Sequence, residues 1–213
     1  MKKVVDAIKD LVTDVNLEVS DSGISLQAMD SSHVALVSLK LKQDGFALYR
    51  TERQITLGLS VTNLAKIMKL VNNNDSITLS CQGPEPTHLK IICESPNQDR
   101  RTEFSLNLIS LDSENLGIPE TSYQSEITMH SAEFSKLCRE LYSLSETVTF
   151  EITQSYVKFA IDGEVGTGNI LIKTGGDDTA INGPLKDANR DAVSLSFALR
   201  YLNLFNKAYT LSQ

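Results

Sequence analysis

Asp30, Ser31, Ser32 and His33 follow one another in the sequence and include the residue types of a nucleophilic hydrolase site. Neighbours in a chain cannot converge on a substrate as an acid, a base and a nucleophile do, so the run is more typical of a turn. An enzyme that uses Asp30 and His33 is kept as an alternative. Because no complete catalytic constellation occurs, we predict that the protein is not an enzyme.

Three further patterns contain residue types found in ligand sites. The histidines are scattered, without the spacing of metal ligands: His33, His88 and His130. The glycines of Gly163–Gly168 open no helix, which favours a hairpin over a phosphate-binding loop. Asp112–Gly117 lacks the order of calcium ligands. We therefore expect no cofactor and no metal.

The composition, with 41% hydrophobic and 22% charged residues, is that of an ordinary globular protein. Cys81, Cys93 and Cys138 form an odd set without metal-like spacing, which favours a reducing compartment and three cysteines packed as small core residues. No apolar run is long enough for a membrane span, and the first residues do not read as a secretory signal. We expect no membrane partner.

Helical spacing of apolar residues predicts helices over 2–13, 62–71, 131–142 and 197–208, with Thr62 as an N-cap. They start roughly sixty residues apart, which indicates an internal repeat of a helix followed by antiparallel strands. The stretch 175–192 is polar and is expected to be loose. Strands are expected over 17–19, 25–29, 34–42, 76–82, 89–94, 102–108, 124–129, 148–153, 156–161, 168–174 and 192–196.

Leu111–Glu120 lies between the two halves of this repeat. It begins polar, places Leu116 and Ile118 around a glycine and reaches Pro119, which suits neither a helix nor a central strand. The stretch is therefore expected to be a surface connector. An ordinary loop and a strap that binds a partner are both compatible with it.

Charge is unevenly distributed along the chain. The net charge is −7, yet the four predicted helices carry a combined +5, so the rest carries −12. Cation pairs spaced three or seven residues apart fall on one side of each helix: Lys2 with Lys9, Lys66 with Lys69, Lys136 with Arg139, and Arg200 with Lys207. One such pair would indicate only a solvated face. Four in repeated units suggest a shared surface that holds duplex phosphates without reading sequence.

Several motifs resemble the proliferating cell nuclear antigen family of eukaryotic sliding clamps, in order over essentially the whole chain. They are Leu26–Val34, Tyr49-Arg50, Leu116–Glu120, Gly166–Ile170 and Phe197–Asn203. The resemblance implies an α+β fold of two similar DNA-clamp domains, with helices on the inner face of antiparallel sheets, and a closed homotrimeric ring. The expected parts are an N-terminal domain over 1–107, a connector over 108–122 and a C-terminal domain over 123–213.

The function implied by the resemblance is that of a DNA polymerase processivity factor in the nucleus. Such a ring encircles double-stranded DNA without sequence specificity, and acts in replication, repair, translesion synthesis and mismatch repair. The implied partners are a second and third copy of the chain, DNA polymerases, the clamp loader, flap endonuclease, DNA ligase and other proteins that carry a short glutamine-and-aromatic peptide.

The resemblance also assigns residues to roles. The implied DNA-binding cations are Lys2, Lys3, Lys9, Lys66, Lys69, Lys136, Arg139, Arg200 and Lys207. The implied partner-peptide groove comprises Met29, His33, Val34, Leu116 and Ile118. The implied trimer interface comprises Phe104, Leu106, Gly168, Ile170 and Ile172, where 102–108 of one subunit pairs with 168–173 of the next.

The chain also departs from the family pattern. The family has a further strand before Lys2 and a further segment after Thr210, so we expect both to be missing here. Gln154 replaces the family's ubiquitin-accepting lysine, and Phe104 replaces an interface tyrosine. Two alternatives to the processivity clamp are a subunit of the related heterotrimeric checkpoint clamp and a partial gene product without activity of its own.

Overall fold

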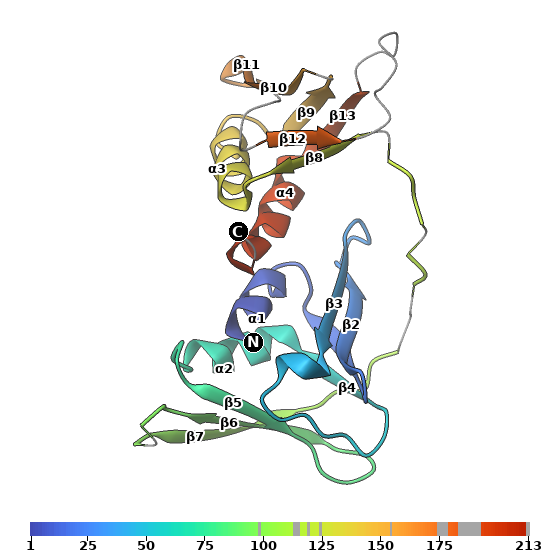
Figure 1. Cartoon of the computed structure of the whole chain (residues 1–213), viewed down its shortest axis with the longest axis vertical. Coiled ribbons are helices and arrows are strands. Elements are labelled where there is room, and N and C mark those ends of the chain that lie inside the picture. Colours follow the sequence, from blue (N-terminus) through green and yellow to red (C-terminus); the bar gives the residue numbers. More distant parts are fainter. Residues whose placement is uncertain are drawn as a thin grey trace. The chain divides into compact units, whose positions relative to one another are not determined.

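The computed structural model describes residues 1–97, 99–112, 116–118, 120–123, 125–153, 155–173, 179–182 and 193–211. The chain divides into two compact units, Met1–Gly117 and Ile118–Gln213 (Figure 1). Among the described residues, no helix has both the length and the apolar character needed to cross a membrane. Gln154 and Pro119, singled out in the sequence, lie outside the described residues.

The first unit contains two helices and two antiparallel sheets. Its elements are α1 (Lys2–Ile8), β1 (Asp14–Ser20), β2 (Gly23–Met29), β3 (Leu36–Lys42), the 3₁₀ turn η1 (Gln43–Gly45), β4 (Ile55–Ser60), α2 (Val61–Lys69), β5 (Ser76–Ser80), β6 (His88–Glu94) and β7 (Arg101–Asn107). The strand orders are β3-β2-β1-β4 and β5-β6-β7, and the second sheet can be followed in Figure 1. Helices α1 and α2 pack against each other.

The core of the first unit follows from the alternation of its strands. Val15 on β1 and Leu59 on β4 are register partners and both are buried. They join Leu64 and Met68 of α2 and Ile91 of β6 in one apolar cluster. Because side chains alternate along a strand, the residues between these positions point to the opposite, outer face of the sheet.

The second unit is built in the same way. Its elements are β8 (Glu126–Met129), α3 (Ser131–Tyr142), β9 (Thr147–Ile152), β10 (Tyr156–Gly163), β11 (Gly166–Lys173), β12 (Thr179–Asn182), β13 (Val193–Ala198), α4 (Leu199–Phe205) and the 3₁₀ segment η2 (Asn206–Leu211). The strand orders are β11-β10-β9-β13 and β12-β8, and α3 packs against α4. Phe159, 1% exposed, meets Phe150 edge-on at a ring-centroid distance of 4.8 Å in the core.

Each unit repeats the same junction between a strand and a helix. In the first unit β4 pairs with β1 and runs directly into α2, where Val61 N–H donates to the Thr13 carbonyl at 2.7 Å. In the second unit β13 pairs with β9 and runs into α4, where Leu199 N–H donates to the Glu146 carbonyl at 2.9 Å. The predicted internal repeat is thus confirmed at the level of single hydrogen bonds.

Some element boundaries differ from those expected. The first helix ends at Ile8, not at residue 13, because the chain must turn before β1 begins at Asp14. The N-cap of α2 is Ser60, whose hydroxyl accepts from Asn63 N–H at 3.5 Å, because β4 already ends there.

The last predicted strand and helix are also divided differently. Phe197 and Ala198 belong to β13, and α4 starts only at Leu199. Within the polar stretch expected to be loose, Thr179–Asn182 forms β12, because it pairs with β8 from Thr179 opposite Met129 to Asn182 opposite Glu126. Tertiary pairing therefore supplied a strand that local composition did not indicate.

Candidate partner groove, cationic helix faces and sheet edges

The Asp30–Ala35 turn is built around a buried carboxylate. Asp30 Oδ1 accepts from Val34 N–H at 2.8 Å and from Ala35 N–H at 2.7 Å. Its Oδ2 accepts from the backbone N–H and the hydroxyl of Ser32. The Ser32 hydroxyl and these backbone donors hold the pKa of Asp30 well below its usual range.

This arrangement decides between the two interpretations of Asp30 and His33. The carboxylate is occupied by donors of its own turn, and His33 adopts a left-handed backbone conformation with φ of 55° while its side chain is exposed. The expectation of a turn is confirmed. Within the described residues, no group of three or more His, Cys, Asp or Glu side chains is arranged to hold a metal ion.

An open groove of about 350 Å³ lies next to this turn in the first unit. It is lined by residues of β1, β2, β3, the Asp30 turn and the connector, among them Met29, His33 and Leu116, three of the five residues expected in the partner-peptide groove. Val34, 68% exposed, and Ile118, 60% exposed, are not among its lining residues, and Ile118 belongs to the second unit. Lining residues that sequence reasoning missed include Asp14, Asn16, Glu18, Gln27 and Leu36.

The predicted cations differ in how their side chains are used. Lys2 donates to the Val71 carbonyl at 2.8 Å, just past α2, and Lys9 pairs with Asp6 at 2.6 Å. The hydrogen bond to Asp6 raises the pKa of Lys9. Both lysines are half-buried and bonded to groups of their own unit. The sequence predicted instead that their side chains would point outward. The remaining predicted cations are exposed: Lys3, Lys66, Lys69, Lys136, Arg139, Arg200 and Lys207.

The exposed cations come from all four helices or from the segment that continues the last one. On α2, Lys66 and Lys69 are exposed, whereas Leu64, Ala65 and Met68 are buried.

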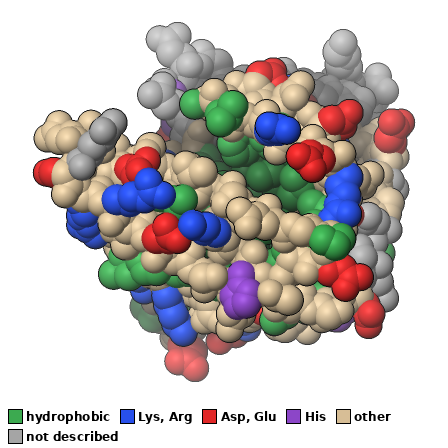
Figure 2. All heavy atoms as spheres, turned by 90° about the horizontal axis from the view of Figure 1, so that it is seen from below, with side chains coloured by type: hydrophobic (Ala, Val, Ile, Leu, Met, Phe, Trp, Pro, Cys, Tyr) green, Lys and Arg blue, Asp and Glu red, His purple; other side chains and the backbone are tan. Residues whose placement is uncertain are grey.

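The cations of the second unit make contacts within their own helices. Lys136 lies 3.8 Å from Glu140, and the Arg139 Nε donates to the Ser135 carbonyl at 3.3 Å. Arg200 lies over the Tyr201 ring, and Lys207 belongs to η2 rather than to α4. The face drawn in Figure 2 also interleaves cations with carboxylates.

The two strands expected at the trimer interface are both sheet edges. Strand β7 is terminal in β5-β6-β7, and β11 is terminal in β11-β10-β9-β13. Phe104 and Leu106 pack against the core of the first unit, as Ile170 and Ile172 do against that of the second. Gly168 is half-buried on the same face of β11 as these isoleucines. The side chains therefore serve their own domains, and each strand has a backbone edge available for pairing.

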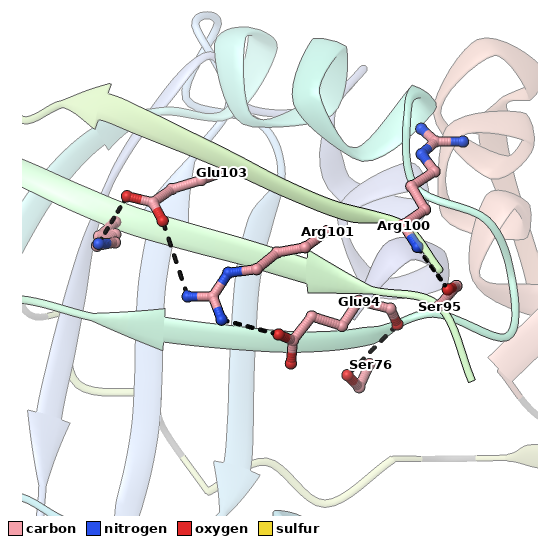
Figure 3. Close-up of polar contacts among 7 residues, drawn as sticks. Ser76, Glu94, Ser95, Arg100, Arg101 and Glu103 are labelled. Atoms are coloured by element: carbon pink, nitrogen blue, oxygen red, sulfur yellow. Dashed lines mark hydrogen bonds and ion pairs between the residues drawn. The ribbon is translucent and has the colours of Figure 1, made fainter. Parts of the chain in front are cut away.

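Ion pairs link edge strand β7 to its neighbour β6 (Figure 3). Arg101 pairs with Glu94 at 3.0 Å, directly across the two strands, and lies 3.9 Å from Glu103. Lys90 pairs with Glu103 at 2.6 Å. Exposed pairs of this kind contribute little free energy each, so the pairing of β7 with β6 rests mainly on their backbone ladder and on the buried Leu106.

The family model described as proliferating cell nuclear antigen, N-terminal domain, matches residues 1–115, and that of the C-terminal domain matches residues 117–213. The proliferating cell nuclear antigen of Chaetomium thermophilum is 45% identical over 212 residues, which cover 100% of this chain and 82% of that relative. The chain therefore belongs to the proliferating cell nuclear antigen family, whose members are DNA sliding clamps, non-enzymatic scaffolds that act as processivity factors in DNA replication and repair.

Proposed function

We propose that this clamp holds duplex DNA through the exposed cations of its helices. The observation that carries the proposal is that every helix, or its continuation, carries an exposed lysine or arginine, and that on α2 and α3 these lie away from the buried stripe. Phosphate contacts of this kind are blind to base sequence and permit sliding. Lys2 and Lys9 contribute less in this proposal, because their side chains are half-buried and their ammonium groups are bonded within the protein.

The proposed working form is a homotrimeric ring in the nucleus, with residues 108–122 as the connector between the domains 1–107 and 123–213. Its support is that β7 and β11 are both terminal strands of antiparallel sheets. Pairing of one with the other across a subunit boundary would satisfy both edges in a head-to-tail contact that can close into a ring. Sedimentation of the purified chain at micromolar concentration is expected to give a trimer, and a monomer would contradict the ring.

The groove beside the connector is the proposed binding site for partner peptides of polymerases, the clamp loader, flap endonuclease and DNA ligase. Met29, Leu36 and Leu116 supply apolar surface in it. The exposed residues Val34 and Ile118 are close in sequence to the lining residues His33 and Leu116. An extended or helical peptide with aromatic anchors suits such a groove.

Replacing Leu116 and Ile118 together by serine is expected to abolish binding of a glutamine-and-aromatic peptide while leaving the oligomeric state unchanged. Both side chains are substantially exposed, so their loss removes apolar contact area for the peptide and little from the core. Calorimetry with a polymerase tail peptide measures the first effect, and sedimentation measures the second. Normal affinity in the double variant would show that the peptide binds elsewhere.

A further inference from the structure

Described residues of the connector are held by one row of residues in the first sheet. Asn16 on β1 and Gly58 on β4 are register partners. The antiparallel register that pairs Leu17 with Leu26 places Gln27 of β2 opposite Asn16 on the other side. Gly58, Asn16 and Gln27 thus form a line across three strands, and Ile109, Leu111 and Leu116 of the connector are bonded to it.

Each member of this row contacts the main chain of the connector. Ile109 N–H donates to the Gly58 carbonyl at 2.9 Å. Asn16 Nδ2 donates to the Leu111 carbonyl at 3.3 Å. Gln27 makes two bonds to one residue: its Nε2 donates to the Leu116 carbonyl at 2.8 Å, and its Oε1 accepts from Leu116 N–H at 2.7 Å.

The two bonds of Gln27 hold Leu116 in a defined orientation. A carboxamide has the same donor and acceptor as a peptide group, so its pairing with Leu116 resembles one bridge of a β-ladder. The same Leu116 lines the groove together with Met29, which lies two residues beyond Gln27 on β2 and on the same face. The bonds therefore fix the connector at the point where its apolar side chain enters the groove.

We infer that Gln27, which lies at the wall of the groove, is a positioning residue for partner binding and acts by fixing Leu116. This inference rests on the proposed function of the groove. The side-chain amide of Gln27 orders Leu116 before any peptide binds. If these bonds were lost, peptide binding would have to order Leu116, and this free energy cost would weaken the affinity for the peptide. The bonds are exposed to solvent, so their loss should disturb the connector without disturbing the core.

The test compares Gln27→Met, which keeps length but removes both bonds, with Gln43→Met. Gln43 is an exposed glutamine of η1 that is not among the lining residues of the groove. Hydrogen exchange at the Leu116 amide is measured in the protein without peptide, and binding of a glutamine-and-aromatic peptide is measured by calorimetry. In Gln27→Met, exchange should be about tenfold faster and the peptide should bind about tenfold more weakly, with an unchanged thermal midpoint. Gln43→Met should match the wild-type protein in all three.

The outcomes separate this inference from the proposed function. Unchanged exchange at Leu116 in Gln27→Met would overturn the inference, because the bonds would then not hold the connector in solution. Faster exchange with unchanged affinity would also overturn it, because a held Leu116 would not matter to the partner. A wild-type protein that fails to bind the peptide would instead overturn the proposed groove, and the exchange comparison would show this to be a different failure.

Discussion

Replacing Gly58 by alanine is expected to destabilise the first unit by about 3 kcal/mol, or roughly 10 °C in thermal midpoint. A Cβ on Gly58 would lie 2.1 Å from the Ile109 carbonyl oxygen, which is a backbone atom at the start of the connector. Neither β4 nor the connector can yield without breaking the hydrogen bond from Ile109 N–H to the Gly58 carbonyl. Thermal unfolding followed by circular dichroism measures the loss.

Two other glycines make this prediction specific. In the second unit a Cβ on Gly163 would lie 2.3 Å from the Leu144 carbonyl oxygen, so Gly163→Ala should be destabilising in the same way. A Cβ on Gly117 would have nothing within 4 Å, so Gly117→Ala should stay within about 1 kcal/mol of wild type. Equal effects of all three substitutions would mean that the backbone contact is not the cause.

Replacing both Lys66 and Lys69 by alanine is expected to shorten residence on DNA and to flatten its dependence on salt. Both side chains are exposed on α2, and alanine favours a helix, so the fold should be retained. Loss of two phosphate contacts should reduce the slope of log K against log salt concentration by about 1.8. Anisotropy of a fluorescent duplex over a range of NaCl concentrations measures that slope.

A matched control comes from the other face of the same unit. Lys40 and Lys42 are exposed on β3 and alternate with Leu39 and Leu41, whose side chains point to the opposite face of that sheet. Replacing both by alanine makes the same change in net charge. The slope should then equal that of the wild-type protein. A similar reduction in both double variants would indicate a general charge effect and contradict a specific cationic helix face.

Elements with strong periodicity could be predicted from the sequence. Helix α3 begins and ends at the predicted residues, because Leu137, Cys138 and Leu141 recur at helical spacing and are buried. The cysteines were expected in the core, and Cys93 and Cys138 are buried while Cys81 is half-buried. Strand β12 could not be predicted, because its four residues are held by pairing with β8 and not by an apolar pattern of their own.

The site could be predicted less completely than the fold. Spacing on a helix indicates which side a cation takes, as it did for Lys66 and Lys69. It does not show that Lys2 reaches the carbonyl of Val71, sixty-nine positions along the chain, although the pairing of Lys9 with Asp6 is a contact between near neighbours on a helix. No pattern in the sequence indicated that Gln27 holds the connector, because its partner Leu116 is eighty-nine positions away.

The attachment of the connector by main-chain atoms has a consequence for how such a protein can diversify. Ile109, Leu111 and Leu116 are held through their backbone amides and carbonyls, so substitution of their side chains can alter which peptides bind without moving the connector. Insertion or deletion of one residue between Ile109 and Leu116 is different, because it would displace the later backbone groups from their partners Asn16 and Gln27 on the sheet. Selection should therefore tolerate exchange of side chains in this segment while conserving its length.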